Sequence, residues 1–187
     1  MKAWIGLGIL ALAVLVGTAG AQMMHGHNQG HMHGADGTGH DEVNMPGLRG
    51  VDATAEESDE LRQMLQNFTA LSRTVEHLPN GIRTRTLAAD PEPAGVLQSH
   101  VIGMIDRVDE GRDPQIMIQS PTLDIFFAKG GEIETTIDVI EGGIEVVQTS
   151  ANPEIVAALH THADEVTGMV ERGMQAVHER MMGQARN

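Results

Sequence analysis

The chain of 187 residues contains no cysteine. This absence excludes disulfides, thiolate catalysis, cysteine-ligated metal clusters and the CxxCH attachment of c-type haem. Aromatic residues are also scarce, because there is no tyrosine, the one tryptophan is Trp4, and the phenylalanines are Phe68, Phe126 and Phe127. So few rings cannot build the stacking platform on which single-stranded nucleic acids bind.

Basic residues are scarce as well. Lysine and arginine number 12 against 26 acidic residues, which gives a formal net charge of -14. Such a charge repels nucleic acids and anionic lipid surfaces and attracts cations or basic partners. We therefore expect no nucleic-acid partner.

The first 21 residues have the pattern of a secretory signal peptide. Lys2 precedes a 13-residue apolar stretch from Ile5 to Gly17, and Ala19-Gly20-Ala21 matches the small-x-small cleavage rule. The stretch is shorter than the ~20 apolar residues of a membrane-spanning helix. We therefore predict cleavage after Ala21, export to the periplasm or beyond the cell, and no membrane span in the mature chain.

The segment 22–50, which follows the predicted cleavage site, is rich in histidine and methionine separated by glycine. The candidate metal ligands are Met23, Met24, His25, His27, His31, Met32, His33 and His40. No hydrophobic period is present, so we expect a tail and linker that are disordered without a ligand. Imidazole suits copper, zinc and nickel, and thioether sulfur favours Cu(I). The composition predicts a copper-binding tail, with zinc or nickel as alternatives and an incidental low-complexity linker as the simpler explanation.

A helix is predicted directly after this linker. Thr54 and Glu57 have the spacing of a capping box, and Leu61, Leu65 and Phe68 follow at helical intervals. We expect the helix to run from residue 55 to about residue 68.

An internal duplication becomes visible when the chain is shifted by 62 residues. Residues 80–111 then align without gaps with residues 142–173, and nine of the 32 pairs are identical. The identical pairs are Gly81/Gly143, Ile82/Ile144, Ala89/Ala151, Pro91/Pro153, Glu92/Glu154, Leu97/Leu159, His100/His162, Val108/Val170 and Gly111/Gly173. We predict repeat units over about residues 69–111 and 131–173.

Each unit has the pattern of two strands and a helix. The predicted elements are strands 71–78 and 82–88 with helix 91–110, then strands 133–140 and 144–149 with helix 153–182. Asn80-Gly81 indicates a type I′ hairpin turn, Glu141 to Gly143 a second turn, and Asp90 and Asn152 are the expected helix N-caps. We therefore predict one pseudo-symmetric α+β domain over residues 51–187, in which helices cover a four-stranded antiparallel sheet.

His100 and His162 occupy the same place in the two copies. On a helical wheel each lies roughly 75° from the centre of the apolar stripe, where a buried face meets a neighbouring element. The two imidazoles are candidates to bind one metal ion, a haem iron or a small ligand. The simpler alternative is that a backbone carbonyl or a carboxylate satisfies each ring. His160 lies on the opposite flank, and Phe126 and Phe127 are expected in the core rather than in a pocket wall.

Several short segments resemble a known group of proteins. They are residues 45–50 (MPGLRG), 78–82 (LPNGI), 99–107 (SHVIGMIDR), 148–153 (QTSANP) and 159–166 (LHTHADEV). Together they resemble a family of exported bacterial proteins without an established function, some of which are associated with c-type cytochrome domains. The resemblance implies that His100 and His162 belong to the family pattern, and it supplies no catalytic residue.

The sequence favours an exported metal-binding protein that sequesters or delivers copper through its tail, while its domain docks a periplasmic protein partner or holds a second metal site. The alternative is a module that binds haem or a small ligand through His100 and His162 and serves electron transfer. No nucleophile elbow, phosphate loop, HExxH helix or dinucleotide fingerprint is present. An enzyme with an unrecognised active site is therefore the least favoured interpretation.

Overall fold

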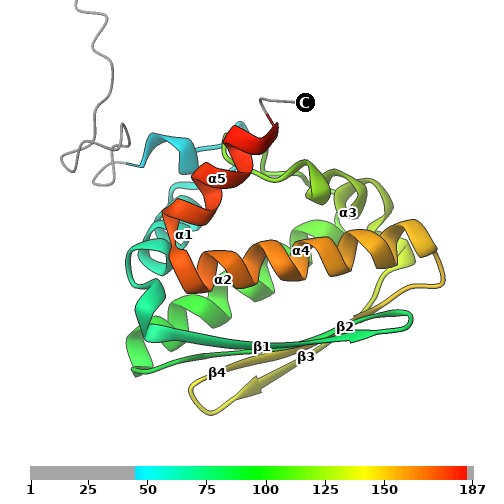
Figure 1. Cartoon of the computed structure of the whole chain (residues 1–187), viewed down its shortest axis with the longest axis horizontal. Coiled ribbons are helices and arrows are strands. Elements are labelled where there is room, and N and C mark those ends of the chain that lie inside the picture. Colours follow the sequence, from blue (N-terminus) through cyan, green and yellow to red (C-terminus); the bar gives the residue numbers. More distant parts are fainter. Residues whose placement is uncertain (1–44, 185–187) are drawn as a thin grey trace, which may run out of the picture. The chain divides into compact units, whose positions relative to one another are not determined.

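The computed structural model describes residues 45–184. The predicted signal peptide and every predicted metal ligand of the tail, from Met23 to His40, lie outside the described residues. Within the described part, a four-stranded antiparallel sheet forms one layer, in the order β1-β2-β4-β3, and the helices lie over one of its faces (Figure 1). The predicted α+β fold class is confirmed.

The elements follow the chain in two similar series. The strands are β1 (Leu71–Leu78), β2 (Gly81–Ala88), β3 (Glu134–Ile140) and β4 (Gly143–Thr149). The α-helices are α1 (Ala55–Gln66), α2 (Pro91–Asp109), α3 (Asp124–Lys129), α4 (Pro153–Arg172) and α5 (Met174–Gln184). Short 3-10 turns lie at Pro46–Leu48, Phe68–Ala70, Pro121–Leu123 and Gly130–Glu132.

The pairing register follows the duplication residue by residue. In the central pair β2–β4, Gly81 pairs with Thr149 and Leu87 pairs with Gly143. A shift of 62 residues exchanges these two pairs, so the pseudo-two-fold axis passes through the pair Thr84–Val146. The two hairpins also share one register. The copies therefore form two related halves of a single sheet.

The first hairpin turn differs from the predicted type I′ turn. The two residues between β1 and β2 are Pro79 and Asn80, and neither Asn80 nor Gly81 has a positive φ. A type I′ turn requires positive φ at both central residues, whereas proline fixes φ near −65°. In the second hairpin Gly142 does have a positive φ, of 71°.

The predicted capping box is confirmed. The Glu57 amide donates to Thr54 Oγ1 at 3.1 Å, and the Thr54 amide donates to Glu57 Oε2 at 2.7 Å. Asn152 also caps its helix, because its Oδ1 accepts from the Glu154 amide at 3.0 Å. Asp90 stands at the N-cap of α2 but its side chain accepts no capping hydrogen bond.

The predicted helix 153–182 is in fact two helices, α4 and α5, which are separated at Gly173. This glycine has a φ of 56°, and the equivalent Gly111 just beyond the end of α2 has a φ of 65°. A side chain at residue 173 would also collide with Phe68, whose Cδ1 lies 2.7 Å from the ideal Cβ position. The periodicity of apolar residues continues across this break, which is why the sequence pattern did not reveal it.

The helices pack on the sheet in two groups. Leu159 and Ala163 of α4 are fully buried against Ile82 of β2, whereas Leu97 and Ile105 of α2 pack with apolar residues of β4. A third apolar cluster joins α1 and α5 to the segment before α1. Between residues 45 and 184, no helix has the length and apolar character needed to cross a bilayer.

Candidate functional site

A cavity of about 280 Å³, partly open to solvent, lies between the sheet and the helices and is lined by elements of both copies. Its lining is mainly apolar. Representative wall residues are Met64, Leu97, Met104, Phe126, Val166 and Met169. Cavities with an apolar lining and a few polar groups are the usual form of small-molecule sites.

Among the described residues, five buried side-chain nitrogen or oxygen atoms lack a hydrogen bond. All five belong to residues that line this cavity. These atoms are Arg73 Nε, His100 Nδ1, Gln119 Oε1, Glu165 Oε2 and Arg180 Nε. Buried polar atoms in native proteins nearly always have a partner. Their concentration around one cavity therefore marks it as a place for a ligand or for ordered water.

One polar part of the wall is built around Glu165 of α4. Ser120 Oγ donates to its Oε1 at 2.7 Å, and Arg180 Nη1 of α5 lies 4.0 Å from its Oε2. Arg180 also donates a hydrogen bond to the carbonyl of Ile118. The break at Gly173 allows this pair to form, because it turns α5 so that Arg180 reaches toward α4.

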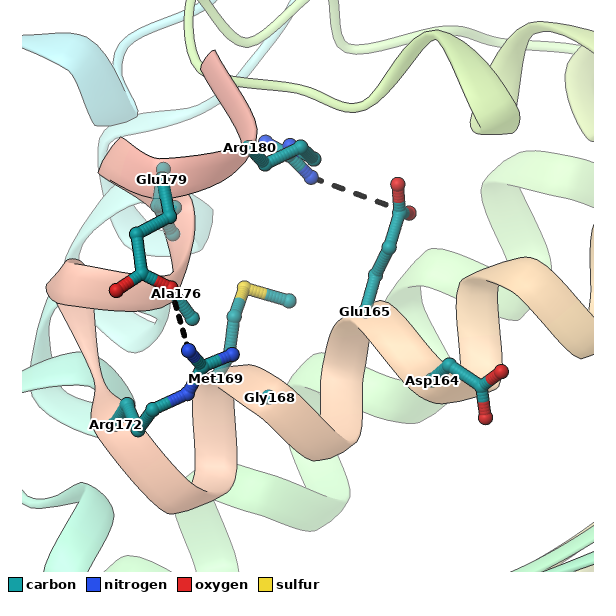
Figure 2. Close-up of a pocket in the computed structure, with 9 residues that line it drawn as sticks. Asp164, Glu165, Gly168, Met169, Arg172, Ala176, Glu179 and Arg180 are labelled. Carbon is teal, nitrogen blue, oxygen red and sulfur yellow. Dashed lines mark hydrogen bonds and ion pairs between the residues drawn. The ribbon is translucent and has the colours of Figure 1, made fainter. Parts of the chain in front are cut away.

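A groove lies between α4 and α5 and shares residues with the cavity. Figure 2 shows Glu165 and Arg180 reaching toward each other at one side of this groove and Arg172 paired with Glu179 at the other. The residues that line both the groove and the cavity are Glu165, Met169, Val177 and Arg180. The groove and the cavity therefore adjoin each other at these side chains.

Arg73 is a charged residue on the inner face of the sheet. Alternation along β1 places it on the same face as Leu71 and Val75, toward the helices. Its Nη1 donates to Thr86 Oγ1 at 2.7 Å, and no carboxylate of the described residues lies within ion-pair distance. Burial lowers the pKa of its guanidinium to about 10, so Arg73 is still charged at neutral pH.

His162 is a neutral base at neutral pH. Burial, together with the nearby positive charges of Arg73 and Arg180, lowers its pKa to about 4. Its side chain lines the cavity and is 29% exposed. Phe126 packs edge-on against the imidazole, with ring centres 5.7 Å apart, and His162 Nδ1 lies 4.0 Å from Glu165 Oε2.

His100 also lines the cavity, from the opposite copy. Its Nδ1 lies 3.8 Å from Glu60 Oε2 of α1, and both side chains are largely buried. The duplicated histidines thus border one cavity, and each has a glutamate beside it. That they bind one ligand together stays a prediction.

His160 is directed away from this cavity, as its place on the helix predicts. Its Nε2 lies 2.8 Å from the carbonyl oxygen of Gly81 and 3.1 Å from that of Leu78, and its ring stacks on His77. Across residues 45–184, no three or more histidine, aspartate or glutamate side chains converge in a group that could hold a metal ion.

Sequence reasoning found the two histidines but missed the charged residues beside them. A signal for Arg73 exists, since the alternation Leu71-Arg73-Val75 places it inside. Arg180 and Gln119 carry no comparable signal, because α5 and the segment before α3 reach the cavity only through tertiary packing. Phe126 is in the core as predicted, but it and Phe127 also line the cavity.

Comparisons with protein-family models, with curated proteins and with solved structures find no significant match to this chain. The resemblance to exported proteins therefore stays a prediction.

Proposed function

We propose that residues 45–184 form a binding module for a small, mainly apolar molecule, which is held in the cavity between the sheet and the helices. The observation that carries this proposal is the coincidence of an apolar lining with all the unpartnered buried polar atoms of the described residues. An apolar lining supplies affinity by removing ligand surface from water, and the polar atoms supply orientation.

The volume favours a ligand much smaller than haem. A cavity of about 150 Å³ holds one benzene ring, so the 280 Å³ found here corresponds to a ligand of roughly a dozen non-hydrogen atoms. A visible absorption band in the purified protein would instead support the haem alternative, with His100 and His162 as the candidate iron ligands.

The test combines titration with a cavity-filling variant. Octanol, a neutral apolar probe, is titrated into the full chain by calorimetry, and native mass spectrometry detects any ligand that copurifies. Val166 lines the cavity, so Val166→Phe places a larger side chain in the space that the ligand would occupy. Val156→Phe is the control, because Val156 is also in α4 but does not line the cavity. We expect octanol to bind the unmodified chain and Val156→Phe, and not to bind Val166→Phe. No binding by the unmodified chain, or equal loss in both variants, would contradict the proposal.

We propose copper capture by the tail as a second, separate function. It is supported by the eight histidine and methionine residues between Met23 and His40, whose donor atoms suit Cu(I) and Cu(II). A Cu(I) competition titration of the full chain and of a variant lacking residues 22–42 tests it. We expect binding in the full chain alone. Equal binding by both forms would move the site into the domain, and binding by neither would exclude it.

A further inference from the structure

The two sides of the cavity differ in charge, and this difference bears on the chemistry of the ligand. The wall contributed by α2 of the first copy is apolar apart from His100, with Leu97, Val101 and Ile105 facing the cavity. The side formed by β1, α4 and α5 carries two guanidinium groups and one carboxylate. A ligand that satisfies both sides has an apolar body and a polar head.

The charges on the polar side do not cancel. Glu165 lies beside Arg180 and accepts from Ser120, so its charge is already balanced. His162 is neutral, because burial and the two guanidinium groups lower its pKa to about 4. Among residues 45–184, the partner of Arg73 is the hydroxyl of Thr86 alone. One unbalanced positive charge is left, at Arg73.

A buried guanidinium without an anion is unfavourable, because desolvation of the charge is not offset by a partner. Arg73 Nε is buried and has no hydrogen bond to any of the described residues, so it presents a donor in the cavity wall. A carboxylate matches a guanidinium in charge and in its two parallel hydrogen-bond positions. A metal cation is disfavoured by the same two positive groups.

From this charge balance and geometry we infer that the ligand is an amphiphilic monocarboxylate whose head binds Arg73 and whose apolar body lies against α2. This inference rests on the proposed function, since it assumes that the cavity binds a small molecule. It adds the sign of the head group and the residue that recognises it. One negative charge is assigned because one positive charge is unbalanced.

The experiment compares two probes that differ only in the head group. Octanoate and octanol are titrated calorimetrically into the full chain at neutral pH. We expect octanoate to bind about tenfold more tightly or better, because a charge-assisted hydrogen bond is added. Arg73→Gln should remove this preference, so that octanoate binds no more tightly than octanol. Arg85→Gln, on the outer face of neighbouring strand β2, is the matched control and should change neither affinity.

The outcomes separate the inference from the proposed function. If neither probe binds, the proposed function fails and the inference fails with it. If both probes bind the unmodified chain with equal affinity, or if Arg73→Gln retains the preference for octanoate, the cavity is a ligand site but the head-group assignment is wrong. Circular dichroism checks the fold of each variant. Should Arg73→Gln not fold, Arg73→Lys replaces it: a smaller preference than in the unmodified chain supports the assignment, and an unchanged one overturns it.

Discussion

The two copies of the repeat share a backbone but use charged residues for different purposes. In the second copy, His162 and Glu165 border the cavity, and in the first copy their equivalents are His100 and Gly103. Arg73 on β1 corresponds to Thr135 on β3. The polar side of the cavity therefore arises from divergence after duplication, and the duplicated frame itself does not require it.

The first copy also contains a buried charged residue, and this residue stabilises the packing of helices. Arg107 of α2 is 3% exposed and corresponds to Met169 in α4. Its Nη2 donates to Glu57 Oε2 at 2.8 Å and to the carbonyl of Asp52 at 2.7 Å, and its Nη1 donates to Asp52 Oδ2 at 2.9 Å. Arg107 thus fastens α1 and the segment before it to α2. A buried cation with a full set of partners holds the fold, whereas Arg73, without such a set, points to a ligand.

The largest expected effect comes from giving the first copy the residue of the second. Arg107→Met leaves Glu57 without its cation, so we expect a loss of about 3–5 kcal/mol in the free energy of unfolding. Arg107 holds the pKa of Glu57 at about 2, below its ordinary 4.5. Stability from this pair is present above pH 4.5 and is lost as the pH falls toward 2, and the variant, which keeps the hydrogen bonds between Glu57 and Thr54, should show a smaller slope. Urea unfolding across that range measures both. Arg62→Met in α1, where the side chain is 33% exposed, is the control, and equal losses in both variants would refute the role assigned to Arg107.

The next effect tests the symmetry of the frame. Gly81 and Gly143 are equivalent, and a Cβ atom at either would lie on backbone of the neighbouring strand, 1.9 Å from the Gln148 oxygen or 2.1 Å from the Thr86 oxygen. Gly81→Ala and Gly143→Ala should each cost about 3 kcal/mol, because the central strands must separate. Urea unfolding of both variants checks the prediction. A large loss in one and none in the other would show that the two halves of the sheet are not equivalent.

The frame could be predicted from sequence because its determinants are local or repeated. The alternation of apolar and polar residues predicted the strands, and the spacing of Thr54 and Glu57 predicted the start of α1. The 62-residue shift predicted how the two copies are related. The ligand-facing chemistry depends on contacts between distant segments. Glu165 meets Arg180 only because the chain breaks at Gly173, and the volume of the cavity follows from how α2 and α4 rest on the sheet. No local pattern carries that information.

A smaller effect distinguishes the second copy by its response to acid. The folded-state pKa of His162 is about 4, against 6.5 when the chain is unfolded. Below pH 6.5 the unfolded chain therefore takes up a proton that the folded chain does not, and stability should fall by about 2 kcal/mol near pH 5. His162→Gln should remove this part of the acid slope. NMR titration of the imidazole checks the cause, because Arg73→Gln removes one neighbouring charge and should raise the pKa of His162. An unchanged His162 pKa in Arg73→Gln would show that the charge of Arg73 does not lower the pKa of His162.

The smallest effect is a gain in stability, and it concerns a position where the copies differ without any contact to explain the difference. Gly95 in α2 corresponds to Ala157 in α4, and a Cβ atom at Gly95 would meet nothing within 4 Å. Gly95→Ala should raise the free energy of unfolding by about 0.5–1 kcal/mol, because glycine loses more backbone freedom in a helix than alanine does. Urea unfolding measures the gain. The same chemical change is therefore expected to disrupt the sheet at Gly81 and to stabilise the helix at Gly95, since only at Gly81 does the neighbouring backbone occupy the space. A loss at Gly95 would contradict this prediction.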